Sequence, residues 1–426
     1  MSRITNIHAR EVLDSRGKPT VEAEVTLTSG WGCAIVPSGA STGRHEACEL
    51  RDGDPMRYDG QGVLKAVANV NTVLTKALVG ADASDQAALD ARLIELDGTP
   101  QKTRLGANAL LAVSLAAARA AADADRTPLY EYLAKLYSAA TGREVAPKIP
   151  LPMINMISGG AHAGGNLDFQ DVMIVPSGAA SYAMSLEWTV RVYRRLQQLL
   201  SDAGYEANLV GDEGGYGPRL KSNREAIEMV VRAIEAAGLS PGHDVSITLD
   251  VAATQFYDGT HYHLQAESGE RLSGEELTGR LVELVNEFPI VSIEDPLAED
   301  DWPAWQGLMQ RLGDRIRIVG DDLLVTNAAH VQRAADTESA NSVLVKVNQI
   351  GTLSETFETM RVAEAAGFTR IVSARSGETE DSTIADLAVG AAADHIKIGS
   401  IVRSERLAKY NRLLRIEEEL GSSGWK

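Results

Sequence analysis

The sequence has 426 residues, more than a single hydrophobic core normally accommodates, so we expect two domains. Hydrophobic residues make up 44% of the chain and charged residues 23%, a composition typical of soluble globular proteins. The formal net charge of −18 argues against nucleic-acid partners, because a phosphate backbone attracts clustered Lys and Arg side chains.

No membrane partner is expected either, because no run approaches the ~20 consecutive apolar residues that cross a bilayer. Charged residues interrupt the first positions, which argues against a secretory signal peptide there. The two cysteines, Cys33 and Cys48, are too few for a disulfide-stapled fold, and this suits a reducing compartment. We therefore expect a cytoplasmic protein.

The first third of the chain predicts an α+β domain. Strand-like patterns come first, at residues 4–9, 20–28 and 33–36, and turn-forming residues between them favour an antiparallel meander. Helical patterns follow at 108–123 and 129–137. A proline-rich segment beyond Gly142 cannot continue a helix, so we expect an N-terminal α+β capping domain at 1–142 and a second domain at 146–426.

In the second domain, short apolar runs alternate with amphipathic helical segments. The strand-like runs are 246–249, 290–293, 316–319, 342–345, 370–372 and 395–398. The clearest helical segments between them are 274–288, 353–366 and 384–393. Repeated strand-plus-helix units favour a parallel sheet, either doubly wound or closed into a barrel.

The position of the charged residues favours the barrel. A charged side chain lies in or near the end of every apolar run, in chain order Asp250, Glu294, Asp321, Lys346, Arg375 and Lys397. A (β/α) barrel assembles its active site from residues at the C-terminal ends of successive strands. A doubly wound sheet gathers its site at one switch point, which leaves charge on nearly every strand unexplained.

Asp250, Glu294 and Asp321 predict a metal site. Three converging buried carboxylates repel one another unless a cation compensates them. Oxygen ligands select a hard cation, so we expect Mg²⁺. The alternative is that each carboxylate merely caps the following helix, which we would prefer for one residue alone but not for three on successive strands.

Lys346 and Lys397 are candidates for catalysis, because a lysine in an apolar run is costly unless it is paired or used. Beside a dication, the pKa of a buried lysine can fall far enough for it to act as a base. The alternative is that each lysine only pairs with one of the metal carboxylates.

Glycine-rich loops add further polar groups. Residues 37–43 contain Ser41, residues 158–166 contain His162, and residues 211–215 contain Glu213. Each loop alone could be an ordinary surface loop or turn. Arg375 and Ser376 offer a guanidinium and a hydroxyl to a phosphate or carboxylate.

These residues stand in motifs that resemble the enolase family over essentially the whole chain. The matching stretches are 14–17, 38–43, 211–215, 292–296, 320–323, 346–351, 375–381 and 404–406. The resemblance implies an enolase-type (β/α)8 barrel behind an α+β domain, and a small phosphorylated carboxylate as substrate, namely 2-phosphoglycerate. It also implies two Mg²⁺ per site and a homodimer or a higher homo-oligomer.

The resemblance also implies a role for each candidate residue. Asp250, Glu294 and Asp321 hold the first Mg²⁺, and Ser41 joins a second Mg²⁺ to the substrate phosphate. Lys346 removes the C2 proton and Lys397 binds the substrate carboxylate, which agrees with the known use of Mg²⁺ with a lysine base in this superfamily. Further roles fall to Arg375 and Ser376 as the phosphate clamp, His162 as the lid-loop histidine, and Glu213 as the acid that helps the C3 hydroxyl leave.

Two positions depart from the family pattern, Ala374 where enolases carry His and Asp171 where they carry Glu. Both belong to the side of the pocket that receives the leaving hydroxyl, where a lost acid or base typically costs ~10²–10⁴-fold in rate. We therefore expect a specialised paralogue with an altered second half-reaction, for example a carboxyphosphonoenolpyruvate synthase of phosphonate biosynthesis. The alternatives are an ordinary glycolytic enolase and a non-catalytic, plasminogen-type binding protein that uses Lys426.

Overall fold

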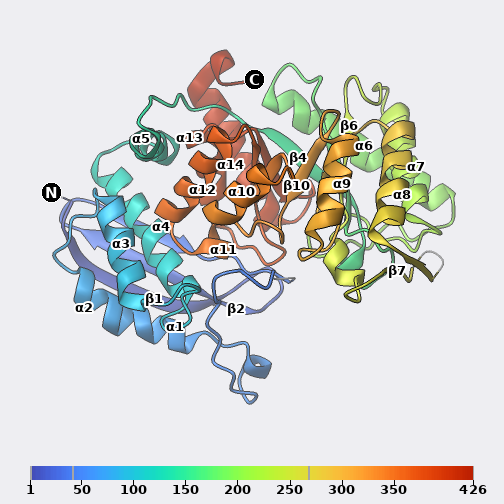
Figure 1. Ribbon diagram of the computed structural model, residues 1–426. Helices are drawn as coiled ribbons and strands as arrows, with labels where there is room; N and C mark the ends of the chain where they lie inside the picture. The colour runs from blue at the N-terminus through green and yellow to red at the C-terminus, as the bar shows by residue number, and fades with distance from the viewer. Residues whose placement is uncertain (1, 41–42, 267–268, 426) are drawn as a thin grey trace.

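The computed structural model describes residues 2–40, 43–266 and 269–425, and its N-terminal part is an α+β unit (Figure 1). Strands β1 (Ile4–Leu13), β2 (Pro19–Leu27) and β3 (Trp31–Ile35) form the expected antiparallel meander. The helices that follow are η1 (Tyr58–Gly60), α1 (Leu64–Asn69), η2 (Val70–Leu74), α2 (Thr75–Leu78), α3 (Gln86–Asp97), α4 (Ala107–Ala124) and α5 (Leu129–Thr141).

The alanine-rich sequence of α4 allows this helix to lie unusually close to the sheet. A side chain at Gly32 of β3 would come within 2.3 Å of the backbone of Ala116 and Ala120. Small residues on both sides therefore bring the two backbones together, and α4 is buried along nearly its whole length.

The C-terminal part is a closed eight-stranded barrel, in the order β10-β11-β12-β13-β4-β5-β6-β9. Its strands are β4 (Leu151–Ser158), β5 (Asp171–Val175), β6 (Ser246–Asp250), β9 (Ile290–Glu294), β10 (Arg317–Gly320), β11 (Ser342–Val345), β12 (Thr369–Ser373) and β13 (His395–Gly399). The surrounding helices are α6 (Tyr182–Asp202), α7 (Asn223–Ala236), α8 (Gly274–Glu287), α9 (Trp302–Leu312), α10 (Ala328–Asp336), α11 (Val347–Ile350), α12 (Leu353–Ala365), α13 (Thr383–Gly390) and α14 (Ser404–Leu420). The expected enolase-type barrel behind an α+β domain is confirmed.

One strand corrects the expectation of a parallel sheet. β5 runs antiparallel to both of its neighbours, β4 and β6. The connection from β4 contains only the three-residue helix η3 (Gly160–His162), which cannot serve as a parallel crossover. The reversal places Asp171, the first residue of β5, opposite Asp250, the last residue of β6, so a strand start joins the edge where the other strands end.

Six apolar side chains fill the inside of the barrel, namely Met153, Met173, Val175, Val319, Leu344 and Ile371. A much larger apolar core lies between the strands and the helices. Because the barrel interior is packed, the polar residues can gather only at its edges.

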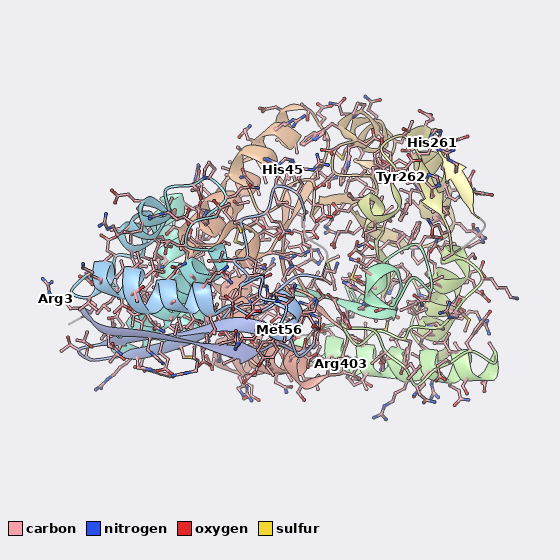
Figure 2. The ribbon with its side chains drawn as sticks, turned by 90° about the horizontal axis from the view of Figure 1, so that it is seen from below. Arg3, His45, Met56, His261, Tyr262 and Arg403 are labelled. Atoms are coloured by element: carbon pink, nitrogen blue, oxygen red, sulfur yellow. The ribbon has the colours of Figure 1, made fainter. Side chains whose placement is uncertain are left out.

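The N-terminal unit is tied to the barrel edge by backbone and side-chain contacts. Ser38 and Gly377 exchange two backbone hydrogen bonds of 2.9 Å. The carboxylate of Asp90 on α3 accepts hydrogen bonds from the backbone and hydroxyl of Ser354 at the start of α12. Seen from below, Arg3, which directly precedes β1, and His261 beside the β7–β8 hairpin (Tyr262–Leu264 and Glu270–Leu272) lie at opposite ends of the molecule (Figure 2). Among the described helices, none is both long and apolar enough to traverse a bilayer.

Candidate active site

A polar cavity opens at the edge of the barrel where most strands end. It is lined by Ala40, His162, Gln170, Glu213, Asp250, Lys346, Ser373, Ala374, Arg375, Ser376 and Lys397. Seven of these are residues that the sequence predicted for the site, and the remaining predicted residues of the described chain contact them directly. The cavity thus gathers side chains from both parts of the protein.

Asp250 and Glu294 face each other across Lys397. The Nζ atom of Lys397 lies 2.7 Å from Oδ2 of Asp250, and 2.9 and 2.8 Å from the two carboxylate oxygens of Glu294. Asp250 ends β6, Glu294 ends β9, and Lys397 projects from the middle of β13. The barrel therefore converts three distant sequence positions into one charge cluster.

Asp321 forms a second cluster with Lys346. The Lys346 ammonium donates a hydrogen bond to Oδ2 of Asp321, and the side-chain amide of Gln349 donates to Oδ1 at 2.8 Å. Lys346 directly follows β11 and Asp321 directly follows β10. Gln349 was not predicted as a site residue, although it stands in the 346–351 motif.

Burial and charge shift the protonation of these groups in opposite directions. Burial, together with the neighbouring Asp250, holds the pKa of Glu294 well above its usual range. Burial lowers the pKa of Lys397, but Asp250 and Glu294 outweigh this and hold it well above its usual range. For Lys346 the effect of burial is likewise outweighed, mainly by Asp321, so its pKa is raised. Both lysines are therefore charged while they pair with these carboxylates.

The carboxylates fit a hard divalent cation. Asp250, Glu294 and Asp321 are 2%, 1% and 7% exposed, so water does little to screen their mutual repulsion. All the donor atoms are oxygens, the ligands that Mg²⁺ prefers. Of these three, only Asp321 belongs to a described group whose carboxylate oxygens all lie within 4.8 Å of one another, and its partners in that group are Asp295 and Asp322. Acidic groups that could hold a metal ion are therefore present at this edge.

His162 lies at the centre of a third cluster. Its Nδ1 is 3.0 Å from Oδ2 of Asp171, and its Nε2 is 3.8 Å from Oε1 of Glu213. Burial lowers the pKa of His162, but Asp171 and Glu213 outweigh it and raise the pKa to about 9. Burial raises the pKa of Glu213, yet His162 and more distant cations lower it to about 2. In this arrangement the proton is on His162, and Glu213 is ionised.

The two positions that depart from the family pattern are Asp171, which contacts His162, and Ala374, which lines the cavity. Asp171 is held from its other side by the amide of Asn155, which donates to Oδ1. Ala374 contributes only a methyl group to the lining, and its backbone N–H donates to the carbonyl of Lys397 at 2.8 Å. The position where the family carries an imidazole therefore adds no polar group, and His162 is the imidazole that lines the cavity.

The predicted phosphate clamp is held by the N-terminal unit. The guanidinium of Arg375 pairs with the carboxylate of Glu46 at 3.1 and 3.3 Å and donates to Oδ1 of Asn348 at 2.9 Å. The hydroxyl of Ser376 accepts hydrogen bonds from Ala40 N at 2.7 Å and from Arg16 at 3.3 Å. Glu46 gave no signal in the sequence, because its partner lies 329 positions further along the chain.

Ser41, the predicted ligand of the second metal, lies outside the described residues, as does Lys426. The neighbouring Ala40 lines the cavity, so the end of the preceding loop segment is at the site. The contribution of Ser41 remains a prediction.

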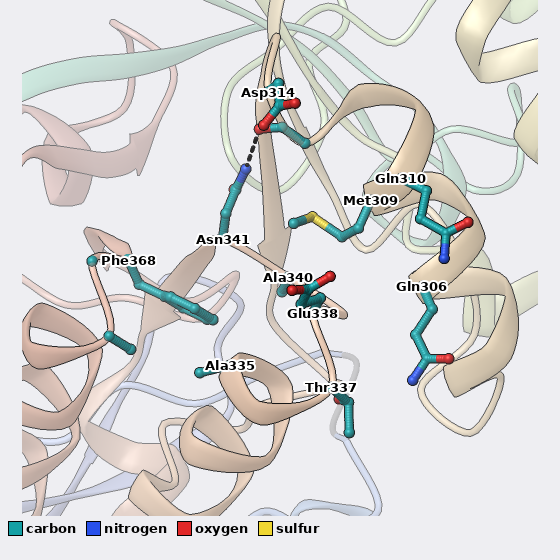
Figure 3. A pocket seen from close by; sticks show the side chains of 13 residues that line it. Gln306, Met309, Gln310, Asp314, Ala335, Thr337, Glu338, Ala340, Asn341 and Phe368 are labelled. Atoms are coloured by element: carbon teal, nitrogen blue, oxygen red, sulfur yellow. Dashed lines mark hydrogen bonds between the residues drawn. The ribbon is translucent and has the colours of Figure 1, made fainter.

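A second groove lies at the opposite edge of the barrel (Figure 3). Its lining includes Asn341 and Phe368, which directly precede β11 and β12. Asn341 donates hydrogen bonds of 3.0 Å to the carbonyls of Gly313 and Ile316, and so links the start of β11 to the segment that precedes β10. The described residues that line the groove include none of the predicted site residues.

Comparison with protein-family models agrees with this architecture in both parts of the chain. Residues 4–133 match the family model described as enolase, N-terminal domain. Residues 146–425 match the model described as enolase, C-terminal TIM barrel domain. The second match contains all eight barrel strands and every candidate catalytic residue predicted from the strand ends.

Proposed function

This chain belongs to the enolase family, and we propose that it removes the proton beside the carboxylate of a small phosphorylated acid, such as 2-phosphoglycerate, and stabilises the resulting enolate with Mg²⁺. The observation that carries this proposal is the pairing of a buried lysine, Lys397, and a partly buried one, Lys346, with three buried carboxylates at one edge of the barrel. Such costly charges have no evident use in a protein that only binds a partner through its surface.

In this proposal Lys346 accepts the C2 proton and Lys397 binds the substrate carboxylate. Asp250, Glu294 and Asp321 hold Mg²⁺, and Ser41 takes part in holding a second ion. Mg²⁺ held by these carboxylates would supply positive charge that stabilises the enolate. Lys346 has to be neutral to act as a base, and loss of its pairing with Asp321 removes the main cause of its raised pKa.

The phosphate is bound by Arg375 and Ser376, which lie together at the cavity wall. A bidentate guanidinium suits a phosphate, and Glu46 holds the guanidinium in place from its other side. His162 and Glu213 act at the leaving hydroxyl: Glu213 has the role of the acid that helps the hydroxyl leave, and His162, 3.8 Å away, holds the proton in the present arrangement.

The second half of the reaction is where we propose that this protein departs from ordinary enolases. Ala374 and Asp171 are both smaller than the family residues and both lie beside His162 or the cavity. The room left by these smaller side chains suits a bulkier group on the substrate. A specialised paralogue such as a carboxyphosphonoenolpyruvate synthase fits this change. An ordinary enolase is the second candidate, because the lysines and carboxylates of the proton-abstraction side are all in place.

Nuclear magnetic resonance in deuterated water separates these two candidates. The protein is incubated with 2-phosphoglycerate and Mg²⁺, and C2 proton exchange and phosphoenolpyruvate formation are followed together. Rapid exchange with little phosphoenolpyruvate supports the specialised paralogue. Brisk phosphoenolpyruvate formation shows an ordinary enolase, and absence of both in the wild type contradicts the proposed chemistry.

A Lys346→Met variant is the matched control, because methionine keeps much of the side-chain volume but cannot accept a proton. It should abolish exchange without preventing Mg²⁺ binding. Incubation of the wild type with cytidylylated phosphonoformate and 2-phosphoglycerate or phosphoenolpyruvate tests the specific synthase activity. Failure to form product removes that activity but leaves the proton-abstraction proposal standing.

Three further expectations concern the domain division, the oligomeric state and the cellular location. We propose that the chain divides functionally into 1–142 and 146–426, that it forms a homodimer or a higher oligomer, and that it works in the cytoplasm. Light scattering of the purified protein measures the oligomeric state directly, and a monomeric mass would contradict the second of these proposals.

A further inference from the structure

Gln255 lies next to the active site and links two of its parts. It belongs to the short helix η4 (Ala253–Phe256), which follows the strand that carries Asp250. Its Oε1 accepts a hydrogen bond from the backbone N–H of Ala161 at 3.3 Å. Its Nε2 donates to Oε1 of Gln170 at 2.6 Å. One amide group thus contacts both the loop that carries His162 and a buried residue of the cavity wall.

Gln170 extends this link to the metal carboxylates. Its Nε2 donates to Oδ2 of Asp250 at 3.1 Å, on the same oxygen that Lys397 contacts. The chain of donors is therefore Ala161 to Gln255, Gln255 to Gln170, and Gln170 to Asp250. Each amide has its oxygen toward the loop and its nitrogen toward the carboxylate.

A backbone ladder runs beside the side-chain relay and keeps its members in register. Gly159 N donates to Gln170 O at 2.7 Å, and Gln170 N donates to Asp250 O at 2.9 Å. Gly160 adopts a φ of +46°, and an added Cβ would lie 3.4 Å from Oε1 of Gln255, so the glycine allows the loop to approach this closely.

We propose that Gln255 is a positioning residue that couples the loop carrying His162 to the carboxylate of Asp250. This inference rests on the proposed metal site at Asp250. When a carboxylate binds a metal ion, hydrogen bonds from neighbouring groups fix its orientation and tune its affinity. Because coupling between two sites is reciprocal, Mg²⁺ binding at Asp250 orders the loop, and an ordered loop favours Mg²⁺ binding.

Two substitutions separate a relay from a local contact. Gln255→Leu removes both hydrogen bonds of the side chain. Gln255→Glu keeps an acceptor for Ala161 but places a second acceptor against Oε1 of Gln170, so the donor to Gln170 is lost. Gln255 is exposed, so neither change disturbs the core. Gln198→Leu is the matched control, because Gln198 is also exposed and donates to a carboxylate, that of Asp202, on the outer helix α6.

Two measurements on the full chain read out the coupling: Mg²⁺ titration by calorimetry, and hydrogen–deuterium exchange of the 158–166 peptide with and without Mg²⁺. In the wild type, Mg²⁺ should slow exchange in this peptide. Both Gln255 variants should lose this effect, and Gln255→Leu should weaken Mg²⁺ binding by about fivefold, the effect expected from one net hydrogen bond. Gln198→Leu should behave as the wild type.

Each other outcome overturns a specific step. If Gln255→Glu keeps Mg²⁺-dependent protection and only Gln255→Leu loses it, Gln255 makes a local loop contact and the relay through Gln170 is wrong. If both variants keep it, the coupling itself is wrong. If the wild type binds no Mg²⁺, the proposed metal site is wrong and the coupling fails with it.

Discussion

Replacing Lys397 by methionine removes the ammonium that lies between Asp250 and Glu294. Both carboxylates are almost fully buried, and Lys397 itself is 5% exposed. Removing one partner of a buried ion pair costs about 3–5 kcal/mol, because the remaining charge stays desolvated. Gln170 still donates to Asp250, so the lower end of that range is expected.

Mg²⁺ should reverse most of this loss. A ligand that binds only the folded state at 100 times its dissociation constant stabilises it by about 2.7 kcal/mol. The assay is urea unfolding of the wild type and Lys397→Met, each measured in chelator and in saturating Mg²⁺. Lys135→Met, which removes an exposed lysine of α5, is the matched control and should unfold as the wild type does.

The outcome distinguishes the two parts of the reasoning. If Lys397→Met is as stable as Lys135→Met in chelator, the lysine does not compensate the buried carboxylates, and the electrostatic argument is wrong. If the variant is destabilised but Mg²⁺ restores nothing, the carboxylates do not form a metal site. Only a large loss in chelator that Mg²⁺ reverses agrees with both.

Three further predictions follow from charged groups outside this pair. Asp171→Asn should lower the pKa of His162 from about 9 by more than one unit, because it removes the largest charge that raises it; an unchanged imidazole titration by nuclear magnetic resonance would contradict the assignment. Burial lowers the pKa of His395 to about 3, so the folded protein favours the neutral imidazole. The contribution of His395 to the free energy of unfolding is therefore complete above pH 6.5 and is lost as the pH falls toward 3. Between these limits the wild type should lose about 1.4 kcal/mol per pH unit more than His395→Gln, measured by urea unfolding; equal slopes would refute the burial argument. Arg406→Met should destabilise the protein by at least about 3 kcal/mol, since its guanidinium satisfies the buried carbonyls of Arg375, Ser376 and Ile398; a thermal midpoint equal to that of the wild type would contradict this role.

The barrel and most of its chemistry could be predicted from the sequence because the signals are local. Each apolar run is short, ends near a charged residue and is followed by a helical pattern. One stretch of sequence therefore identifies the strand, the end of it that reaches the active-site edge and the charged side chain at that end. For the same reason the observed strands differ from the expected runs by only a few residues at their ends; the run 342–345, for example, is β11 itself. The N-terminal meander was predictable on the same grounds, from alternation and turns.

Two features of the site could not be predicted in this way. β4 and β5 were not assigned from the sequence as barrel strands, and the reversal of β5 depends on how the chain returns from η3. Asp171 reaches the catalytic edge only because of that reversal.

The sequence by itself determined which residue types stand at the strand ends, and therefore that carboxylates, lysines and an arginine would meet at one edge of a barrel. Only the tertiary structure decided which of them pair. Lys397 pairs with Asp250 and Glu294, and Lys346 pairs with Asp321. Arg375 pairs with Glu46, which belongs to the N-terminal part of the protein. The physical reason is that pairing depends on side-chain direction over a few ångströms, which strand register and loop closure set and which no local pattern encodes.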